Sequence, residues 1–197
     1  RRRGKFPKTM KSILLLSGGL DSTTLLYDIN SNGGDVFCLM FNYHQRHRQE
    51  LLFAREHCSR LKVQSRVLDL PDLGGLNEQS WIVPNRNMVF LSIAANVAHD
   101  INADSILIGC NSDDASMFPD CRGDFLNSIE QTIKHAGYSV KVIAPFLNLT
   151  KREIAEKAKQ FGINSSNIWT CYRGGSKQCG TCPACIKLKE SNLCLGQ

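Results

Sequence analysis

The sequence predicts an α/β protein with an open, mostly parallel five-stranded sheet and helices on both faces. Two observations support this prediction. Five short apolar runs, bounded by glycine or polar residues, alternate with longer segments of helical periodicity. The connections between them are short, and such alternation is typical of a parallel sheet wrapped by helices. A length of 197 residues suits one medium-sized domain with a sizeable core and a small appendage.

The first predicted strand, residues 13–16, leads into a turn with two adjacent glycines and then into a helix. Such glycines let a ligand approach the backbone closely, and a helix N-terminus presents unpaired N–H groups to an anion. We therefore expect a site for the phosphates of ATP, formed by the consecutive residues Leu16, Ser17, Gly18, Gly19, Leu20, Asp21, Ser22, Thr23 and Thr24. Asp21 is acidic where a phosphate would repel it, so we expect it to hold Mg²⁺ or to cap the helix.

The pattern Ser-Gly-Gly-x-Asp-Ser in this turn resembles the pyrophosphate-binding loop of the adenylating PP-loop ATPases. It is neither the P-loop pattern Gly-x-x-x-x-Gly-Lys-Ser/Thr nor the dinucleotide pattern Gly-x-Gly-x-x-Gly. An ordinary strand-to-helix connection with an Asp N-cap is the alternative. The length of the pattern favours ATP binding.

The remaining elements follow in chain order. Predicted strands cover residues 36–41, 64–70, 105–109 and 140–144, and predicted helices cover residues 25–30, 51–58, 89–99, 125–136 and 151–161. Glycines at 33–34 and 162 end two of the helices. We find neither an internal repeat nor a low-complexity stretch.

Polar residues follow the second and fourth of these strands and precede the helix at 89–99. Ligands of open α/β sheets bind beyond the carboxyl ends of the strands, so these residues should line the same crevice as the glycine turn. The alternative to a binding site is that these polar residues belong to helix starts exposed to solvent, and that Asn85 or Asn87 caps the helix at 89–99. The candidate substrate-binding residues are Tyr43, Gln45, Arg46, Arg86, Asn87, Asp114 and Asp120.

The net charge of +6 is concentrated in a tail, because six basic residues precede the first acid and the other 18 balance 18 acidic residues. We therefore expect residues 1–11 to be a solvated basic tail, of which residues 1–9 are a leader or an engineered remnant, rather than an arm that binds a polyanion. With 42% hydrophobic residues, no 20-residue apolar run and no signal-peptide pattern, the expected protein is globular, has no membrane partner and is cytoplasmic.

Nine cysteines in a chain of this kind indicate metal or thiol chemistry rather than a disulfide framework. Cys171, Cys179, Cys182 and Cys185 have the spacing C-x7-C-x2-C-x2-C, and four thiolates with no open position suit structural Zn²⁺. An iron-sulfur cluster is the competing interpretation. The expected organisation is thus a tail at 1–11, an ATPase domain at 12–165, and a zinc-binding segment at 166–197 packed on that domain.

Five patterns in this order resemble the 7-cyano-7-deazaguanine synthase family of the queuosine pathway. They are Ser-Gly-Gly-x-Asp-Ser, Tyr-x-Gln-Arg-His-Arg-x-Glu from residue 43, Val-Pro-x-Arg-Asn at 83–87, Phe-Pro-Asp-Cys-Arg at 118–122, and Thr-Cys-Tyr at 170–172 with the later cysteines. The resemblance implies an adenine nucleotide α-hydrolase-like, Rossmann-like fold, a homodimer, and Zn²⁺ on the four cysteines. It also implies conversion of 7-carboxy-7-deazaguanine to the nitrile with ATP and ammonia.

The implied reaction begins with adenylation, because a carboxylate is a poor electrophile. Ammonia then gives the amide, and a second activation followed by elimination gives the nitrile. Asp21 would hold Mg²⁺, Arg46 and Arg86 would bind the substrate carboxylate or transition-state charge, and Asp114 or Asp120 would contact the purine-like edge. The sequence shows no amidotransferase signature, so we expect free ammonia as the nitrogen source.

Three departures from the family pattern leave open which molecule accepts the activated acyl group. His44 and Asn85 stand where the family pattern has glycine, and the loop before Val83 is shorter than the family's. A relative that stops at the amide, or passes the acyl group to an amine on a protein or nucleic acid, is therefore an alternative. A tRNA-modifying thiolase is disfavoured by the near-neutral body of the chain. A non-catalytic zinc-containing scaffold is the alternative from a different class.

Overall fold

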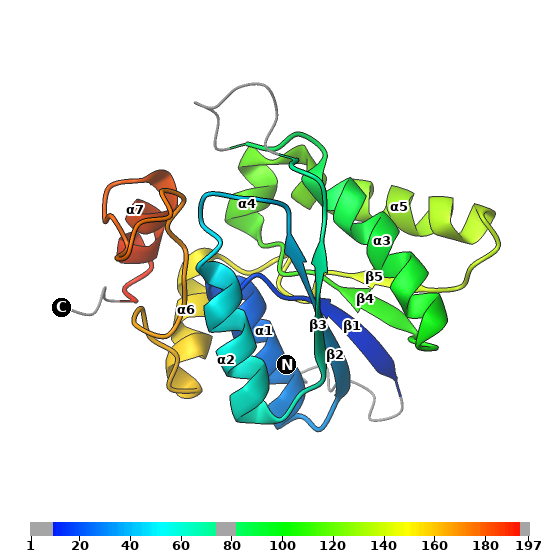
Figure 1. Ribbon diagram of the computed structural model, residues 1–197, viewed down its shortest axis with the longest axis horizontal. Coiled ribbons are helices and arrows are strands. Elements are labelled where there is room, and N and C mark those ends of the chain that lie inside the picture. The colour runs from blue at the N-terminus through cyan, green and yellow to red at the C-terminus, as the bar shows by residue number, and fades with distance from the viewer. Residues whose placement is uncertain (1–9, 74–81, 194–197) are drawn as a thin grey trace.

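The computed structural model describes residues 10–73 and 82–193. Its five strands are β1 (Lys11–Leu15), β2 (Asp35–Asn42), β3 (Ser65–Asp69), β4 (Ser105–Leu107) and β5 (Lys141–Ile143). They form one sheet in the order β3-β2-β1-β4-β5, and every neighbouring pair is parallel. The predicted five-stranded parallel sheet is therefore confirmed, as Figure 1 shows.

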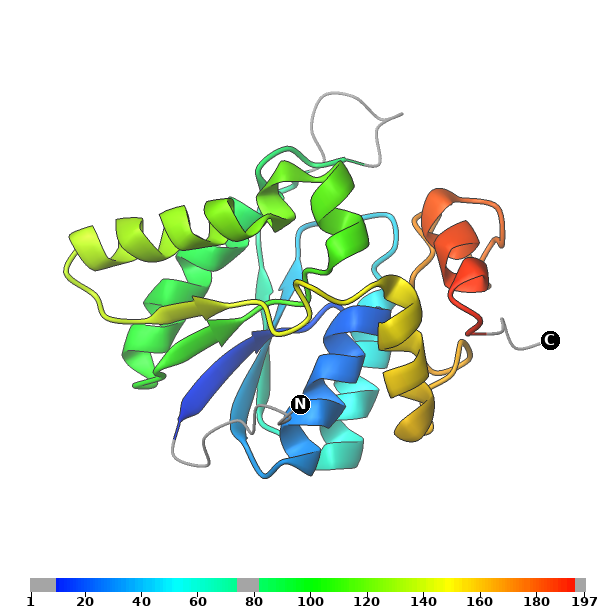
Figure 2. The same cartoon turned by 180° about the vertical axis from the view of Figure 1, so that it is seen from behind.

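Helices cover both faces of this sheet (Figures 1 and 2). One face carries α1 (Leu20–Ser31), α2 (Glu50–Leu61) and α6 (Lys151–Gln160), and the other carries α3 (Arg86–Asp100) and α5 (Gly123–His135). Three short elements lie outside these layers: α4 (Ser112–Met117), the 3₁₀ turn η1 (Pro119–Cys121) and α7 (Pro183–Glu190). The three short elements were not predicted, because a helix of one or two turns carries too little periodicity to be recognised.

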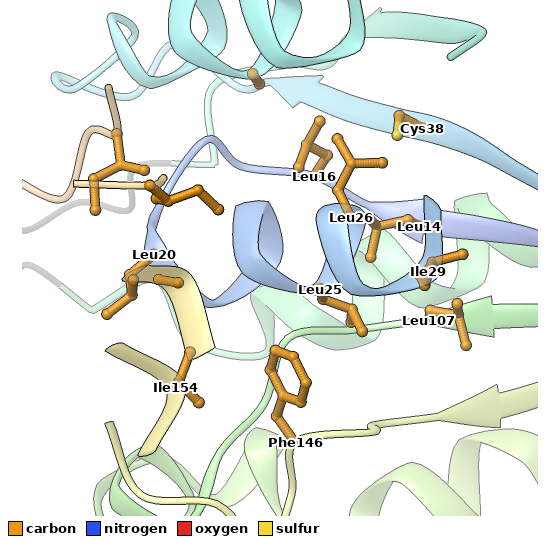
Figure 3. Packing of buried hydrophobic residues seen from close by; sticks show 14 of the residues in the cluster. Leu14, Leu16, Leu20, Leu25, Leu26, Ile29, Cys38, Leu107, Phe146 and Ile154 are labelled. Atoms are coloured by element: carbon orange, nitrogen blue, oxygen red, sulfur yellow. The ribbon is translucent and has the colours of Figure 1, made fainter. Parts of the chain in front are cut away.

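The core explains why the central strands are almost continuously apolar. Successive residues of a strand point to opposite faces. Leu14 of β1 accordingly packs with α1, α2 and α6, whereas Ile13 and Leu15 pack with α3 and α5. Figure 3 shows the first cluster, in which Leu25 and Leu26 of α1 meet Leu14 and Phe146. Because β1 is buried on both faces, the segments that leave its carboxyl end start from a rigid support.

The C-terminal segment packs on the same body. Trp169 and three buried cysteines form a cluster against Phe53 of α2. The expected tail falls largely outside the described residues, as does Cys194, and the expected boundary between residues 165 and 166 stays a prediction. Within the described ranges, no helix combines the length and the apolar character that crossing a membrane would require.

Candidate active site

The strand order places a topological switch point beside β1. The chain leaves β1 for β2 and β3 and then returns to β4 on the other side of β1. Ligands of open α/β sheets bind at such a point, beyond the carboxyl ends of the strands. The segments that follow β1 and β4 are in close contact, because a Cβ atom added to Gly109 would lie 3.1 Å from the backbone nitrogen of Ser22. The glycine turn and the residues after β4 therefore share one site.

The turn itself is fixed from three sides. Ser17 N donates to Ser22 Oγ at 3.2 Å, which closes the turn onto the start of α1. Gly18 has a φ of +85°, and a Cβ atom there would lie 2.2 Å from the carbonyl oxygen of Glu50 in α2. Trp169 N donates to Gly18 O at 2.9 Å. Gly18 is thus required both for its backbone conformation and for the close approach of α2.

The hydroxyl groups predicted to bind phosphate differ in their surroundings. Ser17 is exposed, and its Oγ lies 3.0 Å from Ser22 Oγ. Thr23 and Thr24 are fully buried, and Thr24 Oγ1 donates to Leu20 O at 2.7 Å. The residue that caps α1 is Gly19, without a side-chain hydrogen bond, so the expectation that Asp21 caps this helix is wrong.

Asp21 instead belongs to a cluster of two carboxylates and two lysines. Lys151 Nζ lies 2.6 Å from Asp21 Oδ2 and 3.4 Å from Asp114 Oδ2, and Lys187 Nζ lies 3.5 Å from Asp114 Oδ1. Burial raises the pKa of Asp21 against the opposing effect of Lys151. Burial would lower the pKa of Lys151, but the two carboxylates outweigh it and raise that pKa. Lys151 is therefore held as a cation beside the glycine turn.

One oxygen of this cluster is left for a ligand. Asp21 Oδ1 is buried and has no hydrogen-bond partner among the described residues. A buried oxygen without a partner is costly unless something binds it, and hard cations such as Mg²⁺ prefer carboxylate oxygens. Asp21 therefore fits the Mg²⁺ role expected from the sequence. A cavity of about 370 Å³ adjoins the cluster, between α4, α6 and α7.

A second group of predicted residues surrounds the exit of β2. Arg86 Nη1 donates to Tyr43 OH at 3.1 Å, and its guanidinium lies 5.9 Å from the ring centroids of Tyr43 and Phe90. Gln45 is buried, and its amide donates to Glu50 Oε1 at 2.9 Å. Burial raises the pKa of Glu50 to about 7. Gln45 thus acts by orienting Glu50 rather than by facing solvent.

The remaining predicted substrate residues lie in three different places around the site. Asn87 Nδ2 donates to Asp120 O at 3.1 Å, so α3 and η1 are joined at this edge of the sheet. Asp114 lies in the lysine cluster described above. Arg46 is exposed, and its carbonyl oxygen lies 1.9 Å from the position of a Cβ atom added to Gly174. The loop after β2 therefore touches the C-terminal segment.

Sequence reasoning missed Lys151, Lys187 and Glu50. A signal existed for Lys151, because it is the first residue of α6, after the capping box of Thr150 and Glu153. A cation is unfavourable at the N-terminus of a helix, so a lysine there indicates a partner elsewhere. Glu50 closes the Tyr-x-Gln-Arg-His-Arg-x-Glu pattern, but no pattern indicated that it is buried.

The four predicted metal ligands come together. The sulfur atoms of Cys171, Cys179, Cys182 and Cys185 all lie within 4.8 Å of one another. The backbone N–H groups of Thr181 and Cys182 donate to Cys179 Sγ, and they lower the pKa of that thiol to about 5. Sulfur atoms around a tetrahedral metal are about 4 Å apart, and metals bind thiolates. The residues fit a metal site.

The chain matches one family model over nearly its whole length. The model, described as "Queuosine biosynthesis protein QueC", matches residues 11–82 and 77–193. Among curated proteins, 7-cyano-7-deazaguanine synthase from Caldicellulosiruptor saccharolyticus is 36% identical over 203 residues, covering 92% of this chain and 90% of the relative. The Methanoregula boonei protein of the same name is 35% identical, covering 92% and 94%.

The aligned length exceeds the part of this chain that it covers. Since 92% of 197 residues is about 181, about 22 of the 203 aligned positions hold no residue of this chain. The two parts of the family match meet at residues 77–82. This is the loop that the sequence indicated to be short.

Solved structures confirm the fold class. U34-tRNA thiolase NcsA from Methanococcus maripaludis with its [4Fe-4S] cluster has a TM-score of 0.62 at 19% identity, covering 97% of this chain and 66% of that one. NH3-dependent NAD synthetase from Campylobacter jejuni has a TM-score of 0.55 at 18% identity, covering 80% and 66%. These similarities concern the fold. On the family match and the curated relatives, the chain belongs to the QueC family of queuosine biosynthesis proteins, enzymes that carry the name 7-cyano-7-deazaguanine synthase.

Proposed function

We propose that this chain converts 7-carboxy-7-deazaguanine and ammonia to 7-cyano-7-deazaguanine, with ATP as the activating substrate. The observation that carries the proposal is the meeting of the glycine turn with the Asp21, Asp114 and Lys151 cluster at one switch point. The names of its curated relatives support the product. The partly buried lysine, and the Asp21 oxygen that has no hydrogen-bond partner among the described residues, support an adenylation step.

The residues of the glycine turn would receive the phosphates, through the backbone at Gly18 and Gly19 and through the exposed hydroxyl of Ser17. Asp21 would hold Mg²⁺, which neutralises phosphate charge when bound. Lys151 would place a positive charge beside the leaving pyrophosphate, a position at which electrostatic stabilisation lowers the barrier most effectively. Arg86 would bind the substrate carboxylate, because its guanidinium is already oriented by Tyr43. Arg46, Asn87 and Asp120 stay candidates for contacts with the deazapurine.

For the four-cysteine site we propose Zn²⁺ in a structural role. Four thiolates leave no open coordination position, and the site packs against Trp169, which holds Gly18. Metal analysis of the purified protein distinguishes Zn²⁺ from an iron-sulfur cluster, which would also show a visible absorption band. We further propose a homodimer, which light scattering of the purified chain tests.

A second product is favoured by one observation, the shortened loop before α3. If the longer loop of the family covers the side on which the acceptor binds, its shortening in this chain would admit a larger amine, and the enzyme would then stop at the amide or form a conjugate. Mass spectrometry after incubation with the acid, ATP and ammonia separates the alternatives. The nitrile supports the proposal. Amide without nitrile at complete conversion of the acid contradicts it, and no consumption of ATP with any acceptor would support a non-catalytic scaffold.

A further inference from the structure

Glu50 is a partly enclosed carboxylate with one oxygen occupied and one available. It is the first residue of α2, and its side chain is 12% exposed. Gln45 Nε2 donates to its Oε1 at 2.9 Å, and His47 Nε2 lies 3.6 Å from the same atom. Among the residues that the structure describes, Oε2 has no hydrogen-bond partner. The second oxygen is therefore free to accept a proton from a bound ligand.

The orientation of Glu50 is imposed by the backbone of β2 through Gln45. The Gln45 side chain accepts a hydrogen bond from Tyr43 N at 2.9 Å and donates one to Phe41 O at 3.2 Å. These two bonds fix which end of the amide faces Glu50, because one requires an acceptor and the other a donor. A carboxylate held in this way is preorganised for one task.

Glu50 also lies against the phosphate turn. Its carbonyl oxygen would be only 2.2 Å from a Cβ atom on Gly18, so the backbones are in direct contact. An acyl adenylate with its phosphates on this turn would lie beyond the carboxyl ends of the strands, at the edge of the sheet where Glu50 begins α2. The nitrogen nucleophile has to reach that carbon.

The charged and titratable groups around Glu50 are Arg86, Tyr43 and His47. Burial raises the pKa of Glu50 to about 7, with Gln45 and Arg86 acting in the opposite direction. Burial lowers the pKa of His47 to about 4, so His47 is neutral near neutral pH. A carboxylate with a raised pKa is a stronger base than an ordinary glutamate, and it is still largely ionised slightly above neutrality.

We propose that Glu50 is the catalytic base that takes a proton from the ammonium ion. The inference rests on the ammonia-dependent function proposed above. One N–H bond of ammonium breaks, the proton passes to Glu50 Oε2, and the freed electron pair forms the C–N bond at the acyl carbon. The C–O bond to AMP then breaks with its electron pair on the phosphate oxygen. A second proton leaves the nitrogen for solvent, which gives the neutral amide.

The test compares two nucleophiles in a Glu50→Gln variant, with Glu56→Gln on the exposed side of the same helix as the matched control. Ammonium has to lose a proton before it attacks, whereas hydroxylamine is largely neutral at neutral pH. We expect kcat/KM for ammonium to fall about 100-fold near neutral pH in Glu50→Gln, a typical loss for a missing general base. The rate of hydroxamate formation with hydroxylamine and the rate of acid-dependent ATP–pyrophosphate exchange should stay close to those of the wild type. The deficit with ammonium should shrink near pH 9, where free ammonia is abundant.

An unchanged rate with ammonium would overturn the inference, and so would an equal loss with both nucleophiles or a loss of pyrophosphate exchange, since those indicate a structural role. Failure of the wild type to form product with either nucleophile would instead refute the proposed function. If Glu50→Gln does not fold, the wild-type pH profiles decide. The inference requires kcat/KM expressed per ammonium ion to rise up to about pH 7, as Glu50 ionises, and then to level off, with no rise near pH 7 for hydroxylamine. A rise for ammonium that continues tenfold per pH unit above pH 7, as for attack by free ammonia without a base, contradicts it, and so does a rise near pH 7 for both nucleophiles.

Discussion

Gly18 and Gly19 are adjacent in the phosphate turn, yet the structure predicts opposite responses to alanine. In Gly18→Ala the φ of +85° disfavours any L-residue, which costs about 1–2 kcal/mol. The new Cβ atom would also lie 2.2 Å from Glu50 O and 3.0 Å from Ala54 N, both backbone atoms of α2. Moving a packed helix to relieve such a contact costs about 1–3 kcal/mol more.

Gly19→Ala is the matched control. Gly19 has φ −79° and ψ 177°, which any residue adopts, and its added Cβ would lie 3.4 Å from Ser17 Oγ and 3.6 Å from Trp169 O. This substitution should change the free energy of unfolding by less than about 0.5 kcal/mol.

Thermal unfolding of the two variants measures the difference. At about 2–4 °C per kcal/mol for a chain of this size, Gly18→Ala should lower Tm by about 4–20 °C, whereas Gly19→Ala should lower it by at most about 2 °C. Equal Tm values for the two variants would refute the docking of α2 on Gly18. A stable Gly19→Ala variant that has lost ATP binding would in addition locate the phosphates at this turn.

Three further predictions concern strain, pH and metal. His44 has a φ of +61°, so His44→Gly should raise the free energy of unfolding by about 0.5–1 kcal/mol in a denaturant titration, whereas His44→Ala should not raise it. The folded pKa of Glu50, about 7, exceeds its ordinary value of 4.5. The stability contributed by neutral Glu50 is therefore complete below about pH 4.5, and it falls by about 3 kcal/mol as pH rises through 7. In Glu50→Gln the free energy of unfolding should no longer fall over this pH range. If the fall persists in the variant, it belongs to another titratable group. Removing the metal proposed for the four-cysteine site with a chelator should lower Tm and slow pyrophosphate exchange, because the cysteine cluster packs on Trp169, whose N–H binds Gly18 O. An unchanged Tm after stoichiometric metal loss would contradict this coupling.

The sheet could be predicted from the sequence because each strand is a short apolar run between polar or glycine-containing segments. The clustering of the four cysteines could be predicted because they lie close together in the sequence, at the spacing typical of metal ligands. The strand order was not predicted, since the periodicity of a strand does not determine its neighbour. It is the order that brings Gly109 against Asp21.

Pairings over long sequence separations account for the parts of the site that were missed. Lys151 is 130 residues from Asp21, and local patterns say nothing about such a pair. The positions of His44 and Asn85 were flagged as departures from glycine, and both have positive φ values, 61° and 56°. The backbone has therefore kept the conformation that glycine favours, although the side chains differ.

The most direct test of the proposed function follows the oxygen atoms of the substrate. We propose incubating the enzyme with 7-carboxy-7-deazaguanine labelled with ¹⁸O in its carboxylate, together with ATP and ammonia, and analysing nucleotides and product by mass spectrometry. Adenylation at both steps predicts two molecules of AMP for each nitrile, each carrying one ¹⁸O atom, and unlabelled pyrophosphate. Label in inorganic phosphate, or nitrile formed without labelled AMP, would contradict the account.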